Sequence, residues 1–239
     1  GLIVRSQTQV TKAIIQAATQ LKVIARAGVG VDNIDLDEAT KHGIIVINAP
    51  EGNTISATEH SMAMLLFMAR HIPKAHHSLQ SGEWNRKAFK GTELYNKTVG
   101  IIGTGRIGLG VAKRAQSFGM HILAHDPYLS EEKAQELGIE RSSISDIARE
   151  ADFVTVHTPL TAKTRGIIDY PFFERAKPTL QIINVARGGI INEQDLVQAL
   201  DEELIARAAI DVFENEPATA SPLTKHDKVI VTPHLGAST

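Results

Sequence analysis

The stretch VGIIGTGRIGLGVAKRAQSFGMHILAHD, residues 99–126, decides the fold. Its apolar pattern predicts a strand over 99–102, a helix that runs to Phe118, and a second strand that ends at Asp126. Between the first strand and the helix lies the turn GTGRIG, residues 103–108. A helix that follows such a turn presents N–H groups and the positive end of its dipole to a phosphate. The stretch therefore predicts a strand–turn–helix–strand unit with an anion-binding turn.

The three glycines of this turn and the acid after it predict a dinucleotide site. Gly103 permits the tight turn, Gly105 lets a pyrophosphate approach the backbone, and Gly108 lets the helix pack closely on the strand. Asp126 ends the next strand, where its carboxylate would accept hydrogen bonds from both ribose hydroxyls of NAD and repel the 2′-phosphate of NADP. Glycine-rich turns also occur in ordinary strand–helix connections, but the complete unit is specific and predicts NAD as the cofactor.

Composition excludes several classes of function. The 239 residues are 43% hydrophobic and 22% charged, and the formal net charge is −2. The sequence has no long basic stripe, so it does not predict nucleic-acid binding. The most apolar run, residues 62–69, is too short to span a bilayer. The absence of cysteine excludes disulfides, zinc–thiolate sites and thiol nucleophiles. We expect a cytoplasmic protein with no membrane, nucleic-acid or metal partner.

The amino-terminal part alternates short strands and helices, which predicts a parallel sheet. Pro50 and Gly52 then interrupt the pattern, so we expect a small domain over 1–49 and a larger one over 50–239. The expected strands are 2–4, 23–25 and 44–47, and the expected helices are 11–18 and 36–42, the second capped by Asp35.

The larger domain is expected to open with a helix and an arm, over about 54–97. Ser56 and Glu59 have the spacing of a capping box, which predicts a helix that begins there and runs to about Arg70. Its apolar residues cover more than one face, as at a domain junction or a subunit interface. The segment 79–97, which holds Trp84, has little periodicity, and a dimer contact and a plain surface loop account for it equally well.

Four more apolar runs join the two strands of the opening stretch. They are residues 153–156, 180–184, 206–210 and 228–231. Continuous apolar runs are typical of strands that are buried on both faces. The fold class predicted is α/β, a doubly wound (Rossmann) parallel sheet with a second, smaller α/β domain.

Ligands of such a sheet bind beyond the carboxyl ends of its strands, and three residues there suit oxidation of a hydroxy acid. His234 has the pKa range of a general base, and a carboxylate such as Glu216 would fix its tautomer. Arg187 would hold a substrate carboxylate with its two-pronged guanidinium. Each also has a plainer interpretation, as a loop histidine, a solvated acid and a surface arginine.

The other histidines have no metal-binding spacing. We expect no site role for those on predicted helices, namely His42, His60, His71, His76 and His77. His157, at the end of a strand, is expected to line the cofactor cleft without a catalytic role.

Longer segments resemble one enzyme family across essentially the whole chain. They include RAGVGVDNID at 26–35, NAPEGNTISATEH at 48–60, NVARGGIIN at 184–192, AAIDVFENEP at 208–217 and TPHLGAST at 232–239. Together they are similar to the D-isomer-specific 2-hydroxyacid dehydrogenases. The resemblance implies a flavodoxin-like smaller domain, of which about fifty residues before Gly1 and a helix after Thr239 would be missing, and a homodimer or homotetramer.

The resemblance also implies site roles. His234 would be the acid/base, Glu216 its partner and Arg187 the substrate holder. Beyond the glycines and Asp126, the cofactor would be contacted by Arg106, Ile107, Thr158, Val185, Ala186, Asp211, Gly236 and Ala237. The expected substrate-binding residues are Arg5, Arg26, Asn53 and Arg86, a cationic group that suits a phosphorylated substrate.

Within the family, the segments RAGVGVDN and PHLGAST resemble the branch that oxidises 3-phospho-D-glycerate in L-serine biosynthesis. The alternatives are a reductase of glyoxylate or hydroxypyruvate on the same fold, and an NAD-binding corepressor without turnover.

Overall fold

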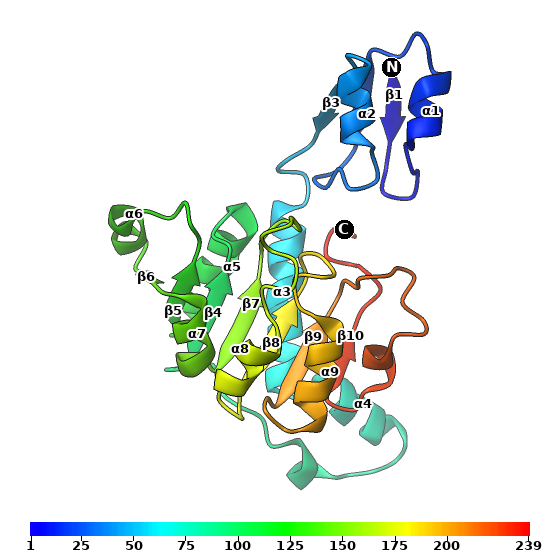
Figure 1. Cartoon of the computed structure of the whole chain (residues 1–239). Coiled ribbons are helices and arrows are strands. Elements are labelled where there is room, and N and C mark those ends of the chain that lie inside the picture. The colour runs from blue at the N-terminus through cyan, green and yellow to red at the C-terminus, as the bar shows by residue number, and fades with distance from the viewer. The chain divides into compact units, whose positions relative to one another are not determined.

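The structure is a computed structural model that describes residues 1–239 and divides into two compact units (Figure 1). Unit 1 is Gly1–Thr54 and unit 2 is Ile55–Thr239. The division falls a few residues beyond the expected boundary at 49/50. No helix in either unit has the length and apolar character needed to cross a membrane.

Unit 1 is a three-stranded parallel sheet with two helices. The strands pair in the order β1-β2-β3, and the elements are β1 (Leu2–Val4), α1 (Lys12–Ala17), β2 (Val23–Arg26), α2 (Leu36–Lys41) and β3 (Ile45–Asn48). The Asp35 side chain accepts a hydrogen bond from Glu38 N at 2.9 Å, which confirms the predicted cap of α2. The expected parallel sheet is therefore present.

Unit 2 contains a seven-stranded, wholly parallel sheet. Its order is β10-β9-β8-β7-β4-β5-β6. The strands are β4 (Thr98–Ile102), β5 (His121–His125), β6 (Glu140–Arg141), β7 (Phe153–Val156), β8 (Gln181–Asn184), β9 (Arg207–Ile210) and β10 (Val229–Val231). The six predicted strands are confirmed, and β6 is an additional, two-residue edge strand.

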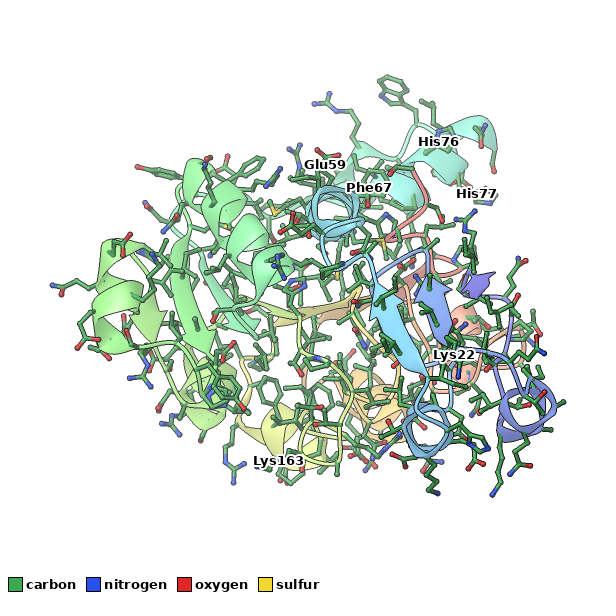
Figure 2. All side chains as sticks on the ribbon, turned by 90° about the horizontal axis from the view of Figure 1, so that it is seen from above. Lys22, Glu59, Phe67, His76, His77 and Lys163 are labelled. Carbon is green, nitrogen blue, oxygen red and sulfur yellow. The ribbon has the colours of Figure 1, made fainter.

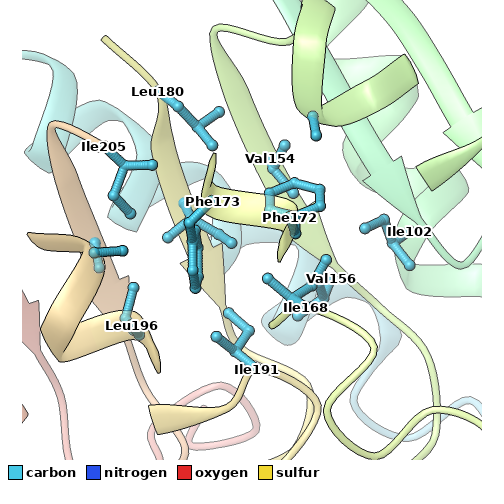
Figure 3. Close-up of a cluster of buried hydrophobic side chains, with 14 of the residues drawn as sticks. Ile102, Val154, Val156, Ile168, Phe172, Phe173, Leu180, Ile191, Leu196 and Ile205 are labelled. Carbon is cyan, nitrogen blue, oxygen red and sulfur yellow. The ribbon is translucent and has the colours of Figure 1, made fainter. Parts of the chain in front are cut away.

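Helices cover both faces of this sheet, and neighbouring side chains along a strand pack into two different hydrophobic cores, one on each face. In β7, Phe153 packs in the core shared with the helices at 54–69 and 106–117, whereas Val154 and Val156 pack in the core shared with the helices at 144–150, 170–175 and 193–201 (Figure 3). The helices are α3 (Thr54–Ala69), α4 (Ile72–Gln80), α5 (Arg106–Ser117), α6 (Glu131–Glu136), α7 (Ile144–Glu150), α8 (Tyr170–Arg175) and α9 (Glu193–Asp201), with the short 3-10 helices η1 (Arg86–Phe89) and η2 (Pro222–Lys225). The doubly wound prediction is confirmed.

The capping box predicted at Ser56 is wrong. Helix α3 begins at Thr54, so Ser56 lies inside its first turn and not before it. The segment 49–53 turns back on itself through hydrogen bonds from Gly52 N to Ala49 O and from Thr54 N to Glu51 O, which lets the helix begin earlier than its sequence signature.

Strand order reverses at β4, which pairs with β5 on one side and β7 on the other. In open α/β sheets a ligand crevice forms at such a reversal, outside the carboxyl ends of the strands. The fold thus directs attention to the segments that follow β4, β5, β7, β8, β9 and β10.

Candidate active site

The glycine turn after β4 has room for a ligand where the sequence predicts it. Gly103 has φ +96°, a left-handed conformation, and a Cβ there would lie 2.7 Å from the carbonyl oxygen of His157. A Cβ on Gly108 would lie 2.0 Å from the Gly103 carbonyl oxygen, so helix and turn are in direct contact. Nothing lies within 4 Å of a Cβ built on Gly105, and Gly105 and Arg106 are exposed at the amino end of α5. The turn is therefore tightly packed at Gly103 and Gly108 and has open space at Gly105.

Asp126 lies at the end of β5 and is tied to this turn. Its Oδ2 accepts hydrogen bonds from Thr104 N at 2.7 Å and Thr104 Oγ1 at 3.0 Å, and its Oδ1 accepts one from Tyr128 N at 2.8 Å. Burial alone would raise the pKa of Asp126, but these hydrogen bonds outweigh it and hold the pKa below its ordinary value. The carboxylate is therefore ionised at neutral pH, as discrimination against a 2′-phosphate requires.

His157, after β7, is a neutral group. Its Nε2 lies 2.9 Å from Thr155 Oγ1, and burial lowers the pKa of His157 to about 4. Thr158 follows it, and the Thr158 N atom would lie 3.0 Å from a Cβ on Gly103. His157 and Thr158 thus border the glycine turn at the reversal point of the sheet.

This neutral histidine makes stability depend on pH. Because the unfolded residue has an ordinary pKa near 6.5 and the folded one a pKa of about 4, protons favour the unfolded state between these values. We expect the free energy of unfolding of the wild type to fall by about 2 kcal/mol more than that of His157→Gln between pH 7 and pH 4.5. Urea unfolding at both pH values measures this, and equal losses in the two proteins would contradict it.

An imidazole and a carboxylate meet at the carboxyl end of the sheet. His234 Nδ1 lies 2.8 Å from Glu216 Oε2, and the other carboxylate oxygen, Oε1, accepts a hydrogen bond from Phe213 N at 3.1 Å. A carboxylate is an acceptor, so the proton of the neutral imidazole is on Nδ1, and Nε2 carries the lone pair that can accept a proton. The His234 side chain is 46% exposed, which leaves it accessible. The geometry is that of an oriented general base.

Arg187 lies on the loop after β8, and a buried amide shapes that loop. Asn184 accepts a hydrogen bond from Ala186 N at 3.0 Å and donates one to the Arg187 carbonyl oxygen at 2.8 Å. A Cβ on the next residue, Gly188, would lie 2.0 Å from the Phe213 carbonyl oxygen. The loop that carries Arg187 therefore packs directly against the loop that carries Glu216.

The loop after β10 joins the same group. A Cβ on Gly236 would lie 2.8 Å from Val185 Cγ1 and 3.2 Å from Asp211 Oδ2. Gly236 and Val185 are buried, whereas Ala237 is exposed and Ala186 is half-buried. The structure thus brings together three loops, 185–189, 211–217 and 232–237, with Arg187, Glu216 and His234 among them.

Asp211 is placed differently from the other expected cofactor contacts. Its side chain is fully buried, and its carboxylate is bound by groups of the protein itself. In this structure it organises the loop after β10, and its contact with the cofactor stays a prediction.

The expected substrate-binding residues belong to both units. Arg5 and Arg26 belong to unit 1, where Arg5 directly follows β1 and Arg26 is the last residue of the neighbouring strand β2, and Asn53 also lies in unit 1. Arg86 lies in η1 of the arm, and the arm runs at the amino end of the unit 2 sheet (Figure 1). Within unit 2, Arg86 is thus on the side opposite the glycine turn, and its role in substrate binding stays a prediction.

Two residues near the site carry no expectation of a role. Asn184 ends a predicted strand and opens the segment NVARGGIIN, but the sequence assigns it no role of its own, and His60 on α3 is expected from the sequence to have no site role. His60 is nevertheless close to the site loops, because its Nε2 lies 3.2 Å from Asp211 Oδ1. His76 and His77, by contrast, lie exposed on α4 at the periphery of unit 2 (Figure 2).

Comparison with known proteins identifies the family. Residues 62–236 match the family described as D-isomer specific 2-hydroxyacid dehydrogenase, NAD binding domain. The chain belongs to this family, and unit 2 is an NAD-binding domain. The open turn at Gly105 and the ionised Asp126 fit the pyrophosphate and ribose of NAD.

Curated relatives and solved structures agree with this assignment. D-3-phosphoglycerate dehydrogenase of Bacillus subtilis is 52% identical over 239 residues, and that of Methanocaldococcus jannaschii is 53% identical. Each match covers 100% of this chain and 46% of the relative, so the chain spans about half the length of these relatives. A D-lactate dehydrogenase from Aquifex aeolicus, complexed with NAD and lactic acid, is 29% identical with a TM-score of 0.90, over 99% of this chain and 76% of that one.

The carboxylate of Asp126 yields a prediction about cofactor choice. A hydrogen bond to a charged group contributes about 1.5–3 kcal/mol, so Asp126→Ala should lower kcat/KM for NAD by about 10- to 100-fold. The same change removes the repulsion of a 2′-phosphate, so kcat/KM for NADP should rise. Steady-state kinetics with both cofactors checks this. An unchanged ratio of the two values would remove Asp126 from the ribose site, and Glu140→Ala on the neighbouring strand serves as the control.

Proposed function

We propose that the protein oxidises 3-phospho-D-glycerate to 3-phosphohydroxypyruvate with NAD, the first step of phosphorylated L-serine biosynthesis. The observation that carries this is the His234–Glu216 pair, 2.8 Å apart, on loops that pack against the loop of Arg187 at the edge of an NAD-binding sheet. The relatives that are about half identical to this chain are named D-3-phosphoglycerate dehydrogenase, which favours this substrate over other 2-hydroxy acids.

The proposed chemistry assigns one task to each residue. When bound, NAD accepts a hydride from C2 of the substrate. His234 Nε2 takes the proton of the C2 hydroxyl, and Glu216 stabilises the imidazolium that forms and holds the ring in place. Arg187 holds the substrate carboxylate and so fixes the orientation of C2. Arg5, Arg26 and Asn53 are proposed to bind the phosphate.

A substrate panel tests the proposal. NADH formation is measured in the intact protein with 3-phospho-D-glycerate, D-glycerate, D-lactate and glycolate. We expect the phosphorylated acid to have the highest kcat/KM, and we expect Arg26→Gln to lower kcat/KM for that acid alone. A higher kcat/KM for glycolate or D-glycerate would replace the proposal with a glyoxylate or hydroxypyruvate reductase. This is the second candidate because a structural neighbour, with a TM-score of 0.90, is a glyoxylate reductase from Paecilomyes thermophila.

The remaining alternative, an NAD-binding corepressor, differs in having no turnover. The paired His234 and Glu216 favour an enzyme, because an oriented base is what proton transfer needs. No NADH formation from any acid on the panel, with NAD binding intact, would favour the corepressor. A cytoplasmic location, and the absence of membrane and nucleic-acid partners, are part of the proposal.

We also propose that two copies associate through the side of unit 2 that carries α3, α4 and the arm. Large apolar side chains are exposed there, including Phe67, Leu79, Trp84 and Tyr95, which are 43%, 57%, 78% and 67% exposed (Phe67 is labelled in Figure 2). Sedimentation equilibrium of the wild type and of Trp84→Asp distinguishes a dimer or tetramer from a monomer.

A further inference from the structure

The Asp211 carboxylate is a buried charge with four hydrogen-bond donors. Its Oδ1 lies 2.5 Å from Thr232 Oγ1, 2.7 Å from Leu235 N and 3.2 Å from His60 Nε2, and its Oδ2 lies 2.9 Å from Gly236 N. The residue is fully buried, and a buried carboxylate is stable only when its oxygens are well bound. The carboxylate and its four donors therefore form one connected network, the Asp211 network.

The Asp211 network holds the loop that carries His234. The Asp211 carbonyl oxygen accepts a hydrogen bond from His234 N at 2.8 Å, while the Asp211 side chain binds the two backbone N–H groups after His234. His234 has φ +54°, a conformation that a residue other than glycine adopts only when its surroundings impose it. Asp211 is the residue in contact with the loop on both sides of that strained position.

The His60 side chain connects the Asp211 network to helix α3. Its Nε2 lies 3.2 Å from both Asp211 Oδ1 and Thr232 Oγ1. The Thr232 hydroxyl donates its proton to Asp211, so both neighbours of Nε2 act as acceptors and Nε2 carries a proton. One turn further along α3, Met64 Sδ lies 3.9 Å from Thr232 Oγ1, so the same face of α3 contacts Thr232 twice.

We propose that His60 is a positioning residue for His234. Through its bond to Asp211 and Thr232 it fixes the strained loop to α3, so that His234 Nε2 keeps its orientation during proton transfer. The proposal rests on the proposed function, in which His234 is the acid/base. In this proposal His60 acts only through Asp211 and Thr232.

Two substitutions in the intact protein separate this role from a general structural one. His60→Leu removes the donor, whereas His60→Gln keeps an N–H group at a similar reach. We expect His60→Leu to lower kcat by about 10-fold, the effect of one lost hydrogen bond to a charged group, with the Kd of NADH changed less than about threefold. His60→Gln should restore most of kcat, and His121→Leu, an exposed change at the start of β5, should have no effect.

A second measurement does not depend on turnover. Hydrogen exchange at the amides of Leu235 and Gly236, which donate to Asp211, should be faster in His60→Leu and normal in His60→Gln, while exchange in β4 and α5 stays unchanged. If His60→Leu does not fold, His60→Asn, whose shorter amide does not reach Asp211, replaces it in both measurements.

The outcomes distinguish the two proposals. Wild-type kcat and unchanged exchange at residues 235–236 in His60→Leu would overturn the positioning role. Equal losses in the Leu and Gln variants would overturn it as well. Absence of wild-type turnover with every acid of the panel would instead overturn the proposed function, and the exchange experiment would still decide whether His60 holds the loop.

Discussion

Replacement of His234 by glutamine should lower kcat by about 10²–10⁴-fold, the range expected for the loss of general acid–base help. The proton of the substrate hydroxyl then has no oriented acceptor, because Glu216 is on the far side of the ring, at Nδ1. Rapid-mixing measurement of NADH formation would show the loss in the chemical step. The Kd of NADH, measured by fluorescence titration, should stay within about threefold of the wild-type value, since His234 is not proposed to bind the dinucleotide.

Two companion variants make this result specific. His234→Asn tolerates the left-handed backbone at position 234 better than glutamine, so an equal loss in both variants assigns the effect to the missing base and not to the loop. Glu216→Gln keeps the size of the partner and removes its charge, so it should lose less activity than either. Near-normal turnover in His234→Gln would remove His234 from the mechanism.

Replacement of Arg187 by glutamine should lower kcat/KM for the hydroxy acid by about 10²–10³-fold. Removal of one partner of a desolvated charge pair costs about 2–5 kcal/mol, and each 1.4 kcal/mol corresponds to a factor of about ten. The loop keeps the two hydrogen bonds that Asn184 makes with the backbone of Ala186 and Arg187, and it loses the one that the Arg187 guanidinium donates to the Ala186 carbonyl oxygen at 2.7 Å. Steady-state kinetics with varied acid at saturating NAD measures the effect.

Arg187→Lys is the matched control. It keeps the positive charge but not the two-pronged geometry, so its loss should be smaller than that of Arg187→Gln. Equal activity of the glutamine variant and the wild type would show that another group binds the substrate carboxylate. A parallel rise in the Kd of NADH would show instead that Arg187 supports the cofactor site.

Much of the fold was predictable because most of its strands are continuous apolar runs. A run as short as 153–156, bounded by polar residues, is typical of a buried strand, and the GTGRIG turn fixes where the first strand of the opening stretch stops and the helix begins. The edge strand β6 was missed because its two residues, Glu140 and Arg141, are exposed and have no apolar pattern. Its pairing with β5 is a consequence of tertiary structure alone.

The candidate site was predictable to the extent that it lies at strand ends. That rule selects His234 and Arg187 directly, and Glu216 because it follows the strand end at Asp211 within a few residues. His60 could not be found in this way. Its partner Asp211 is 151 residues away, and in the helical pattern His60 is an ordinary polar position. Only packing of α3 against the sheet brings the two together.

The contact at Gly188 has a consequence for how this enzyme class diversifies. There is no space for even a methyl group between Gly188 and the Phe213 carbonyl. Main-chain atoms therefore set the distance between the loop that carries Arg187 and the loop that carries Glu216. Changes of neighbouring side chains can therefore alter the size or charge of the acid that is accepted without disturbing the alignment of the reacting groups. New specificities have to evolve around this fixed junction and not through it.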